Sequence, residues 1–201
     1  MHRCRQKKGI NKYGKEAEQK LIAEFAQLLE YSVFHGRVAN ELTKEERDGA
    51  ANMINLVEEK LNRGHTKENP VLRARSVFNG KVQRGLYSKE KTASPTVSQD
   101  AFTMTCIINA IERRDVAVTD IKGAYLNAKM KDMVIIKIKG PEVGLFCGLD
   151  DSLKKYVIKE NGKDTLYIQL DKALYGCVQS ALLWYDLYSR TLVSFAFILN
   201  L

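Results

Sequence analysis

The chain has 201 residues, of which 45% are hydrophobic and 28% are charged, with 13 glycines and three prolines. This composition is typical of a soluble globular protein with one core, and it excludes collagen-like, low-complexity and disordered chains. The apolar runs are far shorter than the roughly 20 residues that span a bilayer, so a membrane-spanning protein is also excluded.

Lysine and arginine exceed aspartate and glutamate by 32 to 24, and +5 of the net charge of +8 lies in residues 1–20. Positive charge favours contact with polyanions, although an ordinary solvated tail explains it equally well. No apolar secretory segment opens the chain, and the cysteines neither pair at Cys-x-x-Cys spacing nor cluster with histidines. These features favour a reducing intracellular compartment, cytoplasmic or nuclear. The cysteines are Cys4, Cys106, Cys147 and Cys177.

The first predicted elements are two amphipathic helices. Residues 15–32 place apolar side chains on one stripe at helical spacing, with charges opposite. A capping-box pattern from Thr43 to Glu46 begins a second predicted helix over 44–63, which Gly64 would end. Both apolar stripes are expected to pack in a core or against a partner helix.

The second half alternates predicted strands and helices. Extended segments are expected at 71–78 and 133–138, and Asn161-Gly162 indicates a hairpin within 155–170. Ser98 is a candidate cap for a helix over roughly 99–114, and a last helix begins near Gln179. A β-prone run at 116–121 carries a carboxylate near its end. This order of elements predicts an α+β fold.

That carboxylate, Asp120, would be costly at the end of an apolar strand unless it is solvated, paired or bound to a cation. A surface or capping aspartate is the ordinary interpretation, but the residues around it form a longer pattern. They read Asp120-Ile121-Lys122-Gly123-Ala124-Tyr125-Leu126-Asn127. This string, called here the Asp120 motif, resembles the first palm motif of copia-type LTR retrotransposon reverse transcriptases, Asp-Val/Ile-Lys-x-Ala-Phe/Tyr-Leu-Asn.

Two further strings resemble the same family, in the family's order. Residues 174–185, the Leu-Tyr-Gly motif, are similar to Leu-Tyr-Gly-Leu-Lys-Gln-Ser-Pro-Arg-x-Trp-Tyr. Residues 73–83, the arginine motif, hold Arg73-Ala74-Arg75-Ser76-Val77 with Gly80 and Gln83 and resemble the strand Lys/Arg-Ala-Arg-Leu-Val…Gly…Gln of the fingers. The resemblance divides the chain into a basic tail (1–14), a helical lead-in (15–66) and a fingers and palm domain (67–201).

The resemblance implies a metal site and a set of substrates. Polynucleotide synthesis uses two divalent metals, Mg²⁺ or Mn²⁺, that share carboxylate ligands. Asp120 would be the first metal-binding, catalytic carboxylate, assisted by the Ile121 carbonyl. The implied partners are an RNA template, a DNA primer, deoxynucleoside triphosphates and the remainder of a retrotransposon polyprotein.

The resemblance also implies a nucleotide-binding site. Tyr125 would lie under the incoming sugar and disfavour a 2′-hydroxyl, although alone it would be read as a core aromatic. Arg73 or Arg75 would reach the triphosphate, and which of the two does so is open. Gly176 would allow close approach of a nucleotide or template. Gln179 and Ser180 would line the same pocket, whereas the Trp184-Tyr185 pair is expected to pack within its helix.

The chain departs from the family pattern in two ways. Val178, Ala181 and Leu182 stand where the family has Lys, Pro and Arg. The family's second palm motif, aromatic-x-Asp-Asp, is not reached before Leu201, and the adjacent pair Asp150-Asp151 is expected to be a solvated turn. The chain is therefore expected to be truncated, to lack the second catalytic carboxylates and to be inactive in isolation.

Three hypotheses follow, of which two concern function and one concerns folding. The first is an RNA-directed DNA polymerase fragment of a copia-type element. The second is a noncatalytic nucleic-acid-binding or interaction protein derived from the element, which the basic N-terminus and the two arginines favour. The third is a partial palm sheet with an exposed edge that does not fold stably alone.

Overall fold

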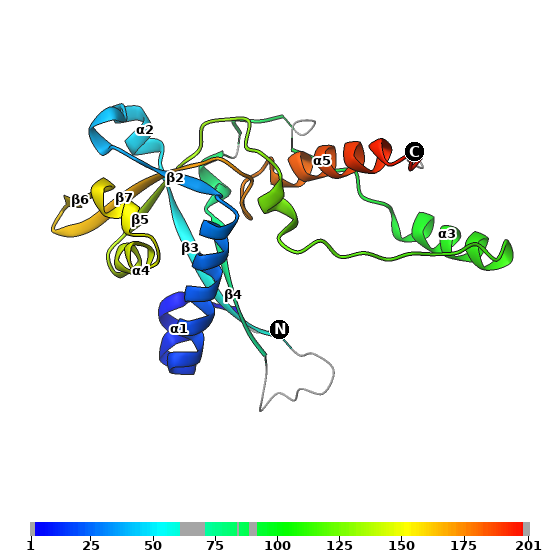
Figure 1. The fold of residues 1–201 in the computed structure, drawn as a ribbon, viewed down its shortest axis with the longest axis horizontal. Coiled ribbons are helices and arrows are strands. Elements are labelled where there is room, and N and C mark those ends of the chain that lie inside the picture. Colours follow the sequence, from blue (N-terminus) through cyan, green and yellow to red (C-terminus); the bar gives the residue numbers. More distant parts are fainter. Residues whose placement is uncertain (1–2, 61–70, 84, 89–91, 199–201) are drawn as a thin grey trace.

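A computed structural model describes residues 3–60, 71–83, 85–88 and 92–198. Within these residues helices flank one mixed sheet, so the expected combination of helices and mainly antiparallel strands is confirmed (Figure 1). The strands are β1 (Arg3–Arg5), β2 (Phe34–Arg37), β3 (Ala51–Lys60), β4 (Val71–Phe78), β5 (Ile135–Lys139), β6 (Val157–Glu160) and β7 (Lys163–Leu170). The helices are α1 (Gln6–Glu30), α2 (Lys44–Gly49), α3 (Gln99–Ile111), α4 (Pro141–Leu149) and α5 (Ser180–Ser194).

Strand β3 joins the two halves of the sheet. The strand order is β1-β3-β5-β7-β2, with β4 also paired to β3 and β6 paired to β7. The first two residues of β3 pair in parallel with β5, through Ala51 opposite Ile136. From Met53 onward β3 pairs antiparallel with β4. One long strand therefore connects the β4 side of the molecule to the β5–β7 side.

The main core lies where α1 and α4 meet the sheet. Phe25 of α1 and Phe146 of α4 are fully buried, and their rings stack with centroids 4.3 Å apart. Phe34 of β2 packs edge-on against Phe146 at 5.6 Å. A second cluster places Ala17 and Leu21 of α1 on the β3–β4 hairpin. Helix α1 thus holds both halves of the sheet through one apolar stripe, as its spacing predicts.

Helix α1 begins earlier than expected. It starts at Gln6 and contains one kink at Gly14, whose φ of +56° interrupts the helical geometry. The helix predicted over 15–32 corresponds to the part after this kink. Residues 3–5 form β1, which pairs with β3. The described part of the basic N-terminus is therefore built into the fold, and elements pair across both of the expected domain boundaries.

The second predicted helix is wrong beyond its first turns. Its capping box is confirmed, because the Thr43 hydroxyl accepts the Glu46 N–H at 3.1 Å and the Glu46 carboxylate accepts the Thr43 N–H at 2.7 Å. The helix ends at Gly49, and β3 follows. Alternate residues of β3, such as Met53 and Val57, are buried, and strands pair along both of its edges. Apolar residues four positions apart, such as Met53 and Val57, lie on one face of a helix and also on one face of a strand. The neighbouring strands that pair with residues 51–60 decide in favour of the strand. Gly64 lies outside the described residues.

Most predictions for the second half are confirmed. Strands β4 and β5 match the expected extended runs, and β6–β7 form the hairpin. Asn161 (φ +49°) and Gly162 (φ +74°) adopt the left-handed conformations that a two-residue type I′ turn requires. The Ser98 hydroxyl caps α3 by accepting the Ala101 N–H at 3.2 Å. Helix α5 begins at Ser180, next to the expected Gln179.

The predicted strand at 116–121 is wrong. These residues have no regular structure, and Val118 is 93% exposed. No strand among the described residues pairs with them, and an unpaired β-prone run gains no ladder of hydrogen bonds. Helix α3 stands at the end of two extended segments, away from the sheet (Figure 1), and has no buried residue. Its exposed apolar side chains are Phe102, Met104, Ile107, Ile108 and Ile111.

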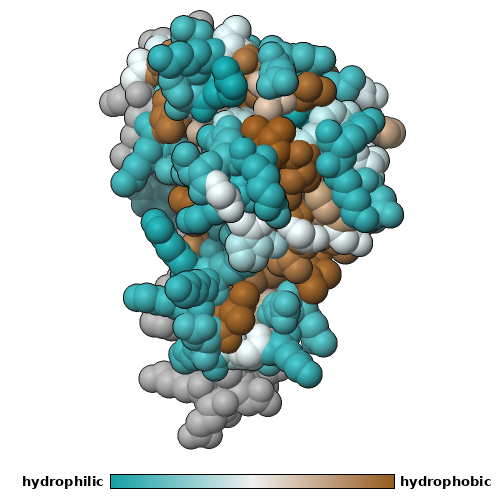
Figure 2. Space-filling view, turned by 90° about the vertical axis from the view of Figure 1, so that its left-hand side faces the viewer, coloured by the Kyte–Doolittle hydropathy of each residue, from teal (hydrophilic) through white to brown (hydrophobic). Residues whose placement is uncertain are grey.

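One face of the molecule is mainly polar. Figure 2 shows mostly hydrophilic residues on the face that carries α2, α4 and the β6–β7 hairpin, with hydrophobic residues in a narrow band between them. None of the helices that the structure describes is both long enough and apolar enough to cross a bilayer.

The ring stack of Phe25 and Phe146 predicts a large local stability effect. Phe146→Ala should lower the free energy of unfolding by about 3–5 kcal/mol, because it removes a buried ring and leaves a cavity between α1 and α4. Phe102→Ala on α3, where the ring is 54% exposed, is the matched control and should change it by about 0.5 kcal/mol or less. Urea denaturation followed by circular dichroism measures both, and equal losses would contradict this assignment of the core.

Candidate functional site

The three sequence motifs meet at the ring of Tyr175. Arg75 of the arginine motif places its guanidinium carbon 4.7 Å from the centre of this ring. Tyr125 of the Asp120 motif packs against it with centroids 4.8 Å apart. Tyr175 itself belongs to the Leu-Tyr-Gly motif. All three side chains are half-buried, so the cluster is partly open to solvent.

A close backbone contact holds two of these motifs together. The Phe78 N–H at the end of β4 donates to the Tyr175 carbonyl at 2.7 Å. Gly176 follows with φ +94°, and a side chain there would collide with the Phe78 carbonyl. A side chain at Gly80 would collide with the Gly176 carbonyl in turn. Gly80 and Gly176 are therefore required by backbone packing within the fold.

Side chains reinforce the same junction. Gln83 is 6% exposed, and its Oε1 accepts the Val178 N–H at 3.1 Å. Cys177, the residue before Val178, is buried in the main core, and this burial raises the pKa of its thiol to about 12. The thiol therefore stays protonated at neutral pH and serves packing, since a nucleophile would require the thiolate.

Gln179 and Ser180, which were expected to line a nucleotide pocket, both have partners inside the fold. The Gln179 Nε2 donates to the Asp132 carboxylate at 2.7 Å, and the Tyr87 hydroxyl donates to the same oxygen at 2.7 Å. Ser180 is 1% exposed and donates to the Leu174 carbonyl at 2.6 Å. The Ser180 bond holds the start of α5 against the loop before it, and the Gln179 bond holds it against Asp132, in the loop before β5. A contact of either residue with a nucleotide remains a prediction.

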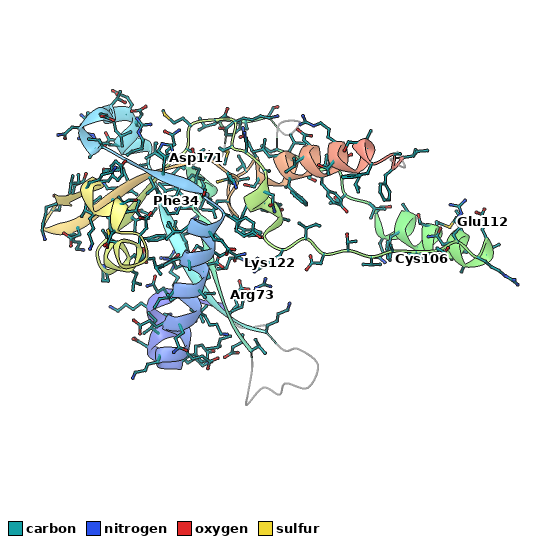
Figure 3. All side chains as sticks on the ribbon, viewed as in Figure 1. Phe34, Arg73, Cys106, Glu112, Lys122 and Asp171 are labelled. Atoms are coloured by element: carbon teal, nitrogen blue, oxygen red, sulfur yellow. The ribbon has the colours of Figure 1, made fainter. Side chains whose placement is uncertain are left out.

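The two arginines of β4 lie in different surroundings. Arg73, labelled in Figure 3, is exposed, whereas Arg75 is partly covered by Tyr175. The strand that carries them is anchored just after Arg75 by Glu24 of α1, which accepts the Ser76 N–H at 2.9 Å. Burial raises the pKa of Glu24, and this hydrogen bond and the charges of Arg75 and Arg73 offset the rise in part. Helix α1 therefore supports the strand that carries both cations.

Asp120 and Ile121 lie in the exposed, irregular segment that precedes Tyr125. The next residue, Lys122 (Figure 3), offers its carbonyl to the Tyr31 hydroxyl at 3.4 Å. Gly123 then adopts φ +59° and starts the short helix Ala124–Asn127, which holds Tyr125. Asp120 is thus joined to the cluster by a short turn, but it does not lie at the end of a strand as expected.

The described residues contain no group of three or more acidic, histidine or cysteine side chains that could hold a metal ion. The adjacent pair Asp150-Asp151 starts the short 3-10 helix Asp151–Tyr156 and does not form the simple solvated turn that was expected, although Asp151 is exposed. Asp150 accepts the Ser152 N–H at 2.9 Å, and Asp151 pairs with Lys154 at 2.7 Å. Asp120 by itself does not meet the ligand requirement of a divalent metal.

Sequence reasoning did not assign a role to Tyr175, Gln83 or Glu24. Tyr175 and Gln83 were both part of the quoted motifs, so their presence in the pattern was the available signal. Glu24 carried no signal, because it lies on the polar side of an ordinary amphipathic helix. Trp184 stacks on Tyr188 one turn later, with centroids 5.3 Å apart, which agrees with a packing role in α5.

Comparison with known proteins identifies the family. Residues 57–200 match the family model of the reverse transcriptase (RNA-dependent DNA polymerase) domain. This range covers all three motifs and most of the chain, so the chain belongs to the reverse transcriptase family. Members of this family act on nucleic acid templates and nucleotides. No curated protein matches the chain, and no solved structure matches it.

The contact between Gly176 and β4 predicts a specific sensitivity. Gly176→Ala should lower the free energy of unfolding by at least about 1 kcal/mol, because it adds strain at positive φ and a clash with Phe78. Gly144→Ala in α4 is the matched control, since nothing lies within 4 Å of the added methyl group and φ is helical. This control should be neutral or stabilise the helix. Thermal unfolding compares the two variants, and a tolerated Gly176→Ala would contradict the junction.

Proposed function

We propose that the chain forms the fingers and part of the palm of a copia-type retrotransposon reverse transcriptase. The observation that carries this proposal is the convergence of the three motifs at Tyr175, because residues far apart in the sequence form one half-open cluster. The cluster combines a cation with two aromatic rings, which suits a triphosphate and a sugar or base. Its substrates would be an RNA template, a DNA primer and deoxynucleoside triphosphates.

Within this function Tyr125 would lie under the sugar of the incoming nucleotide. Its ring packs against Tyr175, which limits its movement before a substrate binds. A rigid ring excludes a 2′-hydroxyl by steric conflict, and this would select deoxynucleotides.

Metal-dependent synthesis needs more than the described residues supply. Asp120, with the Ile121 carbonyl, would provide one part of a site for Mg²⁺ or Mn²⁺. Two-metal nucleotidyl transfer requires further carboxylates that both metals share. The proposed activity therefore belongs to a chain that also carries the family's Asp-Asp motif, and residues 1–201 alone would be inactive.

Primer extension tests this proposal. Residues 1–201 should extend a DNA primer on an RNA template no faster than background with Mg²⁺, and a longer chain that includes the family's Asp-Asp hairpin should extend it. In the longer chain Asp120→Asn should abolish synthesis, because it removes a metal ligand. Asp115→Asn, on the same exposed segment, should leave the rate unchanged.

A longer chain that keeps its activity after Asp120→Asn would refute the metal role. The noncatalytic alternative predicts a different pattern. In that case RNA or DNA binds residues 1–201 with steep salt dependence, and the longer chain shows no synthesis.

The geometry also distinguishes the two arginines. We propose Arg75 as the triphosphate ligand, because stacking on Tyr175 limits the conformations of its guanidinium before a substrate binds. Arg75→Ala should weaken deoxynucleoside triphosphate binding about tenfold, the loss of one charged hydrogen-bonding group. Arg73→Ala is the matched control and should change it by about twofold or less. Isothermal titration measures both, and a larger loss for Arg73→Ala would reverse the assignment.

A further inference from the structure

A cavity of about 670 Å³ lies beside β3, between the start of α1 and the start of α4. It is located where β3 changes partners, since Asn52 pairs with β5 and Met53 pairs with β4. The two strands separate at this point, and the first turns of α1 and α4 close the sides. This volume lies within the usual range for sites that bind small ligands.

The cavity is positively charged. Arg5, Lys7 and Lys139 line it, and none of them forms an ion pair with another described residue. Among the described residues that line the cavity, Glu142 is the one acidic residue. Its carboxylate is hydrogen-bonded to the Asn55 side chain. Three cations against one carboxylate leave an excess of positive charge. The starts of α1 and α4 add the partial positive charge of helix N-termini.

The walls of the cavity are rich in amides. The amide side chains in the lining are Gln6, Asn11, Asn52, Asn55 and Asn79. Asn55 is 4% exposed and well fixed, because it donates to Gln6 at 3.1 Å and accepts from Ser76 at 2.8 Å. The Asn55 amide is therefore occupied within the fold and fixes the wall, whereas Asn11, Asn52 and Asn79 present a donor and an acceptor side by side, which matches the edges of nucleobases. Ile10 and Met53 add apolar surface for a base face.

This cavity is separate from the cluster at Tyr175. Asn55 and Ser76 are opposite each other in the β3–β4 register, and their side chains are bonded on the face that α1 covers. Arg75 directly precedes Ser76 in β4. Because side chains alternate between the two faces of a strand, the Arg75 side chain lies on the face that α1 does not cover. Asn55 and Arg75 therefore lie on opposite faces of the same hairpin, and Arg75, Tyr125 and Tyr175 are not among the residues that line the cavity.

We propose that this cavity binds a small phosphorylated ligand of mononucleotide size. Arg5, Lys7 and Lys139 hold the phosphate, and the amide and apolar walls hold the base. The proposal does not depend on polymerase activity, because none of the residues that would hold the phosphate belongs to the three motifs and Asn79 is the one described lining residue within the arginine motif.

Titration of residues 1–201 with AMP, adenosine and inorganic phosphate tests the proposal by calorimetry. AMP should bind saturably and at least about tenfold more tightly than either of the other probes. The double variant Lys7→Gln/Lys139→Gln should weaken AMP binding about tenfold. Lys15→Gln/Lys20→Gln, two exposed cations of α1 outside the cavity, is the matched control with the same change in charge and should stay within about twofold. Both pairs are exposed, and circular dichroism verifies that both variants fold.

Nuclear magnetic resonance locates the ligand. AMP should shift the side-chain amide signals of Asn52 and Asn55. The proposal is overturned if AMP does not bind, if phosphate or adenosine alone binds as tightly, or if the control variant loses as much affinity. It is also overturned if the shifts lie at Tyr125 and Tyr175, or if an oligonucleotide without terminal phosphates displaces AMP from the cavity.

Discussion

The arrangement of the site depends on one close approach between two backbones. The segment around Gly176 runs against the end of β4, where the Phe78 N–H bonds to the Tyr175 carbonyl and no side chain fits at Gly176 or Gly80. This contact covers part of the outer edge of β4, and Glu24 covers a second N–H of the same edge at Ser76. An edge strand whose outward N–H groups already have hydrogen-bond partners is less available for pairing with another chain. The same contact places the Tyr175 ring between Arg75 and Tyr125, so edge protection and site assembly have one physical cause.

Local signals in the sequence predicted local structure well. The capping box at Thr43, the cap at Ser98 and the turn at Asn161-Gly162 each involve hydrogen bonds or dihedral angles set within four residues, and all three occur as expected. The failures concern strands, whose stability comes from partners distant in the chain. Residues 51–60 became a strand because β1, β4 and β5 pair with them, and residues 116–121 did not because no described strand does. Neither outcome can be read from spacing alone.

The site was predictable in its components but not in its arrangement. The motifs indicated Arg75, Tyr125 and Gly176 by resemblance, and the structure brings these segments together. The resemblance assigned Gly176 to ligand approach, whereas the fold also requires it for contact with β4. The central position of Tyr175 could not be predicted from the motif. The presence of an aromatic residue in a sequence pattern does not reveal which side chains it will contact in the fold. Burial likewise revealed that Ser180 and Cys177 serve the packing of the junction.

The described residues differ sharply in how firmly they are held. Phe25, Phe146 and the β4–Gly176 junction belong to a dense interior, whereas Asp120 follows a segment in which Val118 is almost fully exposed and α3 buries no residue. A metal-binding carboxylate must be held within about 0.5 Å of its working position to support catalysis. The turn at Gly123 and the Tyr31 contact locate the segment after Asp120 but do not restrain the carboxylate itself. Its proposed role therefore requires a further restraint on the segment that carries Asp120, in addition to further metal ligands. The proposed nucleotide contacts at the Tyr175 cluster use side chains that already pack against one another, so the proposed binding and the proposed catalysis place different structural demands on this chain.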